Sequence, residues 1–163
     1  MRRFSIIGLA AFIAVAVIAG GAVAGTSKTT KVIAFTAKYS GNATTQQNDS
    51  LVAIKANGSG TGTLLGAGKI TGTGTADSSV KPCVPFTGPG SMTGKGGVLK
   101  FTVLTGSCGN GDEQGQVFAL VGKAKVIGAT GKLKKAKGTL KFTGTYDRGS
   151  GTFVVKFKGS LSI

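Results

Sequence analysis

The chain contains no histidine and no tryptophan, and its 163 residues include only five acidic residues, two cysteines and three prolines. Without histidine, neither a Ser-His-Asp triad nor a Cys-His pair can be assembled, and the commonest protein ligand of transition metals is missing. The two adjacent acidic residues, Asp112 and Glu113, lie in an expected loop, where their side chains diverge rather than form an acid and base pair. We therefore expect no catalytic residues, no metal site and no cofactor, and we favour a protein that is not an enzyme, with an isomerase as the alternative left open.

Long hydrophobic runs are also scarce, and the only one lies at the N-terminus. Met1-Arg2-Arg3 precedes an uncharged run from Phe4 to Ser27, in which Ala22-Val23-Ala24 has the small-x-small pattern of a cleavage site. We predict a secretory signal peptide over residues 1–24 and a single domain over residues 25–163, which is then secreted, periplasmic or held at the cell surface. If it is not cleaved, the run is long enough to span a bilayer as an anchor.

Both cysteines follow this leader. Two cysteines in an exported chain most often pair, so we predict a disulfide between Cys83 and Cys108. Closing this loop would stabilise the fold by about 3 kcal/mol if the geometry permits. All three prolines lie between residues 82 and 89, and this segment is expected to be a rigid loop or an edge rather than a central strand.

Glycine is abundant, at 29 residues, and no helical period of apolar residues follows the leader, which favours an all-β domain. From Gly58 to Ala76 glycine alternates with threonine around three apolar anchors. A flexible linker is one interpretation, and a hairpin of two strands in a tightly coiled wall is the one we favour. The other strands expected in this half are residues 31–39, a short strand at 51–54 after a polar loop at 40–50, and residues 98–105.

Three apolar alternations occupy residues 116–163, with the two-residue period of half-buried strands. Lysine or small polar residues fill many of the intervening positions, so each strand has one face toward water. The residues that share the apolar faces are Phe118, Leu120, Ala124 and Val126, then Leu140, Phe142, Gly144 and Tyr146, then Phe153, Val155, Phe157, Gly159, Leu161 and Ile163.

The turn between the first two of these strands carries a resemblance to a known family. Residues 126–142, with glycine at 128, 131 and 138, resemble the GGTG-x-F-x-x-A-x-G turn of the allene oxide cyclase and dirigent barrel superfamily. The chain departs from that pattern at Ala129, often glycine, and at Leu133, usually aromatic. The resemblance covers the last third of the chain. It implies an eight-stranded antiparallel barrel with an apolar interior, in a superfamily that includes cyclases of fatty-acid epoxides and proteins that steer phenoxy-radical coupling.

Taken together, these features predict a closed antiparallel β-barrel of about eight strands, whose interior is filled or holds one small ligand. A two-sheet β-sandwich is the alternative. We favour a packed interior, although the same lumen could enclose a small apolar molecule. Tyr39, Tyr146 and Glu113 are the only polar candidates for chemistry on such a ligand. The residues expected to line the lumen are Phe101, Phe118, Leu120, Phe142, Tyr146, Phe153 and Phe157.

The net charge of +15 suggests a second kind of partner. Lys132, Lys134, Lys135 and Lys137 cluster in one turn, and five further lysines lie on the outward faces of the neighbouring strands. We expect this surface to hold the protein to anionic polymers of the cell envelope or the extracellular space. A solubilising face that protects strand edges is the alternative. Nucleic acid is not expected, because the chain is exported and has no outward stacking aromatics.

Overall fold

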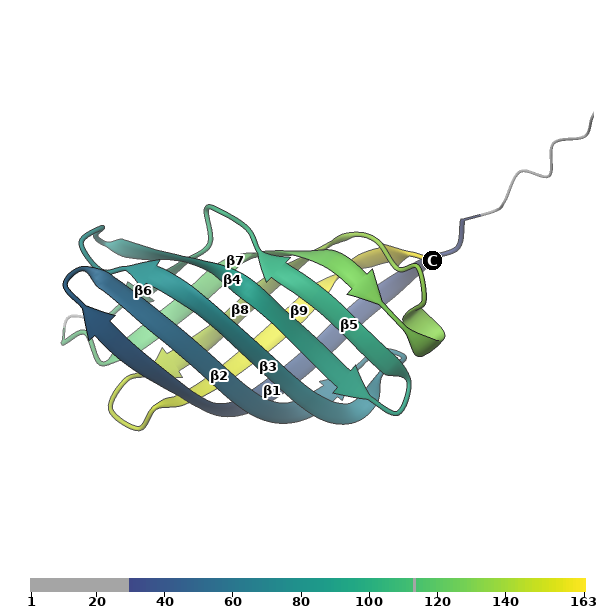
Figure 1. The fold of residues 1–163 in the computed structure, drawn as a ribbon, viewed down its shortest axis with the longest axis horizontal. Helices are drawn as coiled ribbons and strands as arrows, with labels where there is room; N and C mark the ends of the chain where they lie inside the picture. The colour runs from purple at the N-terminus through teal and green to yellow at the C-terminus, as the bar shows by residue number, and fades with distance from the viewer. Residues whose placement is uncertain (1–29, 113) are drawn as a thin grey trace, which may run out of the picture.

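The computed structural model describes residues 30–112 and 114–163, so the predicted signal peptide at residues 1–24 lies outside the described residues. The described chain is built almost entirely of strands, with one short 3-10 turn, η1 (Gly131–Leu133) (Figure 1). The strands are β1 (Val32–Asn48), β2 (Leu51–Gly62), β3 (Gly66–Asp77), β4 (Cys83–Gly94), β5 (Gly97–Val103), β6 (Cys108–Gly111), β7 (Val117–Ala129), β8 (Thr139–Asp147) and β9 (Thr152–Ser162).

The strands close into an antiparallel barrel, which confirms the predicted fold and excludes the sandwich. The order β3-β2-β1-β9-β8-β7-β5-β4 is completed by pairing between β3 and β4, so every one of these eight strands has two neighbours. The ninth strand, β6, follows β5 along the gap between β4 and β7 and pairs with both. At the break between β5 and β6, the buried Ser107 accepts a hydrogen bond through its Oγ from the Lys123 N–H, at 3.1 Å.

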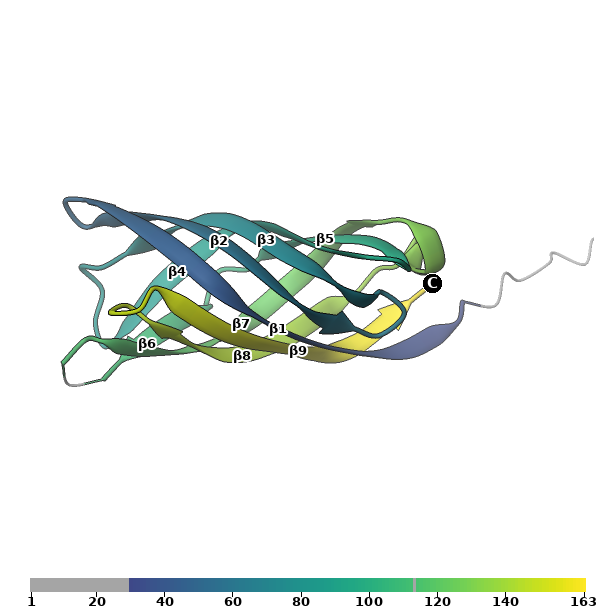
Figure 2. The same cartoon turned by 90° about the horizontal axis from the view of Figure 1, so that it is seen from below.

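The barrel has two different ends (Figures 1 and 2). At one end, η1 lies beside the first described residues and the C-terminus, where Lys31 and Ile163 exchange two backbone hydrogen bonds. At the other end lie the β1–β2 turn, the β3–β4 loop, the β6–β7 loop and the β8–β9 turn. We call the first the closed end and the second the open end, for reasons given below.

Two sequence predictions about strands are wrong. Residues 40–50 are not a polar loop, because β1 continues to Asn48 and pairs with β2 as far as Asn48↔Leu51. Side chains 44–48 are exposed, so backbone hydrogen bonds rather than apolar burial extend the strand beyond its hydrophobic pattern. For the same reason β2 runs on past the four residues that were predicted. The Gly/Thr hairpin over residues 58–76 is confirmed as the second half of β2 joined to β3.

The proline segment is a strand with neighbours on both sides, contrary to the prediction of a loop or edge. The reason lies in where the prolines fall. Pro82 precedes β4, Pro85 lies beyond the end of the β3 ladder, and Pro89 falls in a gap of that ladder between Thr71–Gly72 and Thr75. Proline has no N–H to donate, so it is tolerated at these positions, where the β3–β4 ladder requires no backbone hydrogen bond from that residue.

Interior aromatic rings face glycines on the neighbouring strand, which explains the glycine content. Because glycine has no side chain, a ring on the neighbouring strand can lie directly over its backbone, as in the aromatic and glycine pairs that stabilise curved sheets. A methyl group added at Gly90 would lie 2.5 Å from the Phe101 ring, and one at Gly122 would lie 2.6 Å from the Phe142 ring. The cross-strand pairs are Phe35↔Gly159, Tyr39↔Gly60, Phe153↔Gly41, Phe101↔Gly90 and Phe142↔Gly122.

This arrangement predicts that Gly90→Ala destabilises the barrel by about 1 to 3 kcal/mol, because the new methyl group would overlap the Phe101 ring and force it to move. Gly128→Ala is the matched control, since its methyl group would meet nothing closer than 3.9 Å. Urea denaturation of both variants measures the difference. Equal stability of the two variants would show that the ring does not rest on Gly90.

Candidate ligand-binding cavity

The closed end of the barrel is solidly packed. The turn at residues 130–138 folds across it, and Leu133 and Ala136 point inward from that turn, buried. Backbone hydrogen bonds from Thr130 N–H to the Val98 carbonyl and from Lys132 N–H to the Gly96 carbonyl fix the turn against β5 and the β4–β5 turn that precedes it. The fully buried apolar side chains of this half include Phe35, Leu65, Met92, Leu99, Ala124, Leu133, Leu140 and Leu161.

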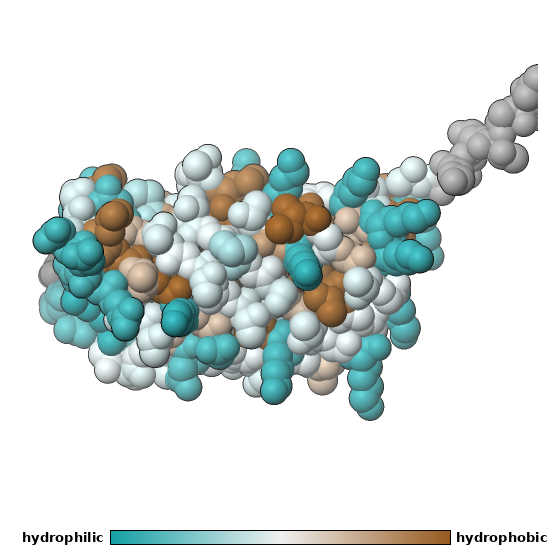
Figure 3. Space-filling model, viewed as in Figure 1, coloured by the Kyte–Doolittle hydropathy of each residue, from teal (hydrophilic) through white to brown (hydrophobic). Residues whose placement is uncertain are grey.

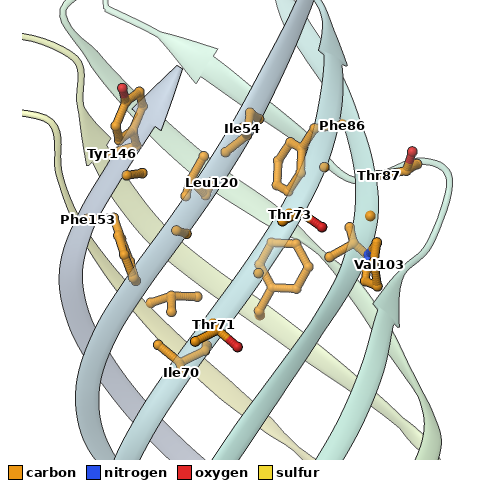
Figure 4. A pocket seen from close by; sticks show the side chains of 18 of the residues that line it. Ile54, Ile70, Thr71, Thr73, Phe86, Thr87, Val103, Leu120, Tyr146 and Phe153 are labelled. Atoms are coloured by element: carbon orange, nitrogen blue, oxygen red, sulfur yellow. The ribbon is translucent and has the colours of Figure 1, made fainter. Parts of the chain in front are cut away.

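The half of the interior nearer the open end contains a cavity of about 190 Å³ (Figure 4). Figure 4 shows the rings of Phe86, Phe153 and Tyr146 around this space. The preference for a packed interior is therefore correct for the closed half and wrong for this half. The residues that line the cavity include Ala43, Ile54, Ala56, Ile70, Phe86, Phe101, Val103, Leu120, Phe142, Tyr146, Phe153 and Val155.

Burial along the strands shows where the cavity meets solvent. Inward-facing side chains become progressively more exposed toward the open end: Ala43 is buried, and Thr45, two residues further along β1, is exposed. Ile54, Leu120 and Tyr146 line the cavity and are only half-buried. The cavity is thus sealed below by the packed half and is accessible from the open end, and exposed residues of the β3–β4 wall, Thr71, Thr73 and Pro89, also border it.

Five of the seven predicted lumen residues line the cavity, namely Phe101, Leu120, Phe142, Tyr146 and Phe153. Phe157 is buried just below them, with its ring centroid 5.5 Å from that of Phe101 and 5.8 Å from that of Phe142. Phe118 does not line the cavity and instead packs against the Tyr146 ring, at 6.3 Å.

Several lining residues that sequence reasoning missed come from strands it misjudged, whereas Ile70, Val103 and Val155 were missed in strands that it predicted. Ala43 lies in the stretch predicted to be a loop, Phe86 lies in the proline segment, and Ile54 and Ala56 belong to a strand predicted to end at residue 54. Gly72 and Gly74 contribute backbone to the wall and have no side chain to fill the space behind them. The signal that was available, and was not used, is the continuation of the two-residue alternation through Ala43 and Ala56.

The three polar candidates are separated by the structure. Tyr146 lines the cavity, whereas Tyr39 does not, and Glu113 lies outside the described residues. No carboxylate is among the lining residues. Within residues 30–112 and 114–163, no group of three or more His, Cys, Asp or Glu side chains could hold a metal ion. Over the same ranges the chain has no helix that is long and apolar enough to cross a membrane.

The Tyr39 hydroxyl is buried and has no hydrogen-bond partner among the described residues. Burial raises the pKa of Tyr39 above 10.0, because the charged phenolate would lose its hydration. As the pH rises past 10, the unfolded chain ionises first. Stability that is present below pH 10 is then lost at higher pH.

We therefore expect Tyr39→Phe to stabilise the protein by about 1 kcal/mol at pH 7, because it removes a buried hydroxyl without a partner. Its advantage over the wild type should grow between pH 9 and pH 11, since phenylalanine does not titrate. Urea denaturation at pH 9 and at pH 11 gives the free energy of unfolding of each protein. The difference between the two proteins at each pH is then compared, because the titration of the lysines contributes equally to both and cancels. An advantage that stays constant with pH would contradict this account of Tyr39.

The described aspartates all lie at or near the open end, and the carboxylates of Asp77, Asp112 and Asp147 accept hydrogen bonds within its turns. The Oδ1 of Asp77 accepts one hydrogen bond from the hydroxyl of Ser79 and another from its N–H. Both bonds lower the pKa of Asp77, and the bond from the hydroxyl has the larger effect. The backbone N–H of Ser150 similarly lowers the pKa of Asp147. Asp112 accepts a backbone hydrogen bond in the β6–β7 loop. These carboxylates have structural roles in the turns and do not enter the cavity lining.

The predicted disulfide is confirmed near the open end. Cys83 at the start of β4 and Cys108 at the start of β6 are bonded, with their Cα atoms 5.4 Å apart. Their strands also pair through Val84↔Gly109, so the bond fixes β6 to the wall that encloses the cavity.

A scan against protein-family models and searches of curated proteins and of solved structures found no match to this chain. The expected relationship to the allene oxide cyclase and dirigent superfamily stays a prediction.

Proposed function

We propose that this protein binds one small, uncharged apolar molecule inside its barrel and does not transform it. The observation that carries the proposal is the apolar cavity between Phe86, Phe101 and Phe153, which is accessible from the open end. Aromatic and aliphatic side chains with few polar groups are the usual lining of small-molecule sites.

The size of the cavity limits the ligand. A cavity of about 150 Å³ lined by Leu, Ile and Phe stays dry and takes up benzene or xenon, whereas sites for drug-sized molecules measure about 300 to 1,000 Å³. At about 190 Å³, this cavity fits a single ring with a short substituent. A long acyl chain would extend through the open end into solvent.

The chemistry of the lining favours binding over catalysis. General acid or base catalysis needs a titratable group within hydrogen-bonding reach of the reacting atom. The phenol of Tyr146 is the one such group in the lining, and Phe118 packs against its ring near the open end. An uncharged ligand is favoured because no lining side chain could pair with a charge, and burying an unpaired charge is costly.

We also propose that the protein acts outside the cytoplasm. The Cys83–Cys108 disulfide supports this location, because such bonds persist in oxidising compartments. An exported carrier of a small apolar compound is consistent with a barrel that is closed at one end and accessible at the other.

The test is binding of toluene, measured by calorimetry and by the shift in melting temperature. Ala43→Leu should weaken toluene binding by about tenfold or more, because each added buried methylene group fills space the ligand needs. Ala34→Leu is the matched control: it lies on the same strand, and Ala34 is exposed. Toluene binding that is absent from the wild type, or equal in the two variants, would overturn the proposal.

A further inference from the structure

Outside the barrel, the register of four neighbouring strands brings lysines directly opposite one another. Lys123 on β7 pairs with Lys141 on β8, which in turn pairs with Lys158 on β9. Two residues before Lys158 on β9, and on the same outward face, Lys156 pairs with Lys38 on β1. All are exposed. We call these five residues and Lys125, which is also exposed, the lysine ladder. The four strands lie side by side in Figure 2.

This arrangement costs stability when nothing is bound. Adjacent strands are about 4.7 to 4.9 Å apart, and like charges directly opposite one another in a sheet are destabilising. The four strands contain a single acidic residue, Asp147 at the end of β8, and its carboxylate accepts hydrogen bonds from Gly149 and Ser150. The ladder therefore lacks acidic partners on its own strands.

Protection of strand edges does not explain the ladder. Lysines on an edge strand prevent pairing with other chains, but β7, β8, β9 and β1 each have two hydrogen-bonded neighbours in the closed barrel. Solubility does not require lysines in register either. On the face seen in Figure 3, to which β2 and β3 contribute, hydrophilic side chains are mixed with hydrophobic ones and with residues of intermediate hydropathy.

Two surface grooves extend the ladder at its ends. One is lined by Lys125 together with Lys134, Lys135 and Lys137 of the η1 turn. The other is lined by Lys38, Lys156 and Lys158 with neighbouring threonines. Three of the four lysines predicted from the turn, Lys134, Lys135 and Lys137, thus form one end of a longer basic track that crosses the strands.

We propose that this track binds a linear polymer that carries a phosphate at each repeat. A line of charges fits a chain better than a compact anion, and the convex wall of a narrow barrel presents few of its lysines to a flat membrane at once. Lysine binds phosphate as a point charge through a flexible side chain, and needs no fixed bidentate geometry. The site is distinct from the cavity and does not depend on the function proposed for it.

The test uses long-chain inorganic polyphosphate as the probe. The ladder variant replaces Lys123, Lys141 and Lys158 with glutamine, and the matched control makes the same replacement at Lys55, Lys69 and Lys100, which are also exposed and oppose no other lysine. We expect the ladder variant to lose at least about tenfold in affinity and the control less than about threefold, since clustered charges act together on one chain. The ladder variant should also show the smaller decrease in affinity with rising salt.

Equal losses in the two variants would overturn the proposal, because binding would then follow net charge alone. Three other results would also overturn it. Triphosphate could bind as tightly as the polymer, or a carboxylate polymer such as polygalacturonate could bind as tightly as polyphosphate. The protein could also bind phosphatidylglycerol vesicles more tightly than polyphosphate.

A second measurement needs no polymer. At low salt the ladder variant should melt at a higher temperature than the control. Salt at 1 M should remove most of that difference, since screening then reaches only about 3 Å. A ladder variant that gains nothing at low salt would contradict the repulsion on which the proposal rests.

Discussion

Leu133→Ala is expected to lower the free energy of unfolding by about 2 to 5 kcal/mol, the usual cost of truncating a fully buried leucine. Leu133 is 0% exposed, and it is the innermost side chain of the turn that closes one end of the barrel. The cost should fall near the upper limit if the turn cannot move inward, because its backbone is hydrogen-bonded to Val98 and Gly96 on the rim. Urea denaturation measures the loss.

Lys132→Ala is the control for this experiment, because Lys132 belongs to the same turn and is exposed. It should change stability by no more than about 0.5 kcal/mol, as is usual for surface substitutions. A loss below 1 kcal/mol for Leu133→Ala would show that the closed end tolerates a void. The packed half of the barrel would then not be what seals the lower end of the cavity.

Replacing both cysteines with alanine should cost about 3 kcal/mol, because the disulfide closes a loop between residues 25 positions apart in the chain. The effect should be local as well as global. β6 has only four residues; it pairs with β4 through Cys83, Val84 and Pro85 alone, and its other ladder, to β7, is also only four pairs long.

Hydrogen exchange distinguishes the local effect from a uniform one. Amides of residues 108–111 should lose protection first in the double alanine variant, while those of β8 and β9 keep theirs, since regions with few contacts open separately from the core. Reduction of the wild-type protein should give the same pattern. Uniform loss of protection across all strands would contradict the view that the disulfide secures this one part of the wall.

The sequence predicted the C-terminal strands well because their core faces are continuous. In β9, Phe153, Val155 and Phe157 alternate with exposed residues, and the structure buries all three. Such a pattern needs no knowledge of the partner strands. The same alternation placed Phe101, Phe142 and Phe157 in the interior before the fold was known.

The first half of the barrel was harder to predict, because hydrogen bonding there replaces hydrophobic burial as the main local signal. The end of β1 is polar on both faces, and β4 carries prolines whose tolerance depends on gaps in the β3 ladder. Neither property is visible in a single strand. Part of the cavity lining was missed for the same reason, since Ala43 and Phe86 belong to these segments.

The lysine ladder illustrates the limit of face prediction. Alternation alone puts Lys123, Lys141 and Lys158 on the outside of their strands, and all three are exposed. That they lie directly opposite one another depends on strand register, which is set by turn lengths and by the packing of the interior. Only the assembled barrel brings these charges into one row.

The central claim, a dry apolar cavity open at one end of the barrel, is tested most directly by diffraction from crystals held under xenon pressure. Xenon binds preferentially in empty apolar cavities of this size. We predict one strong xenon site between Phe101, Leu120 and Phe153, and no ordered water there before xenon is applied. A cavity filled by ordered water, or one that takes up no xenon because the side chains have collapsed into it, would contradict the account.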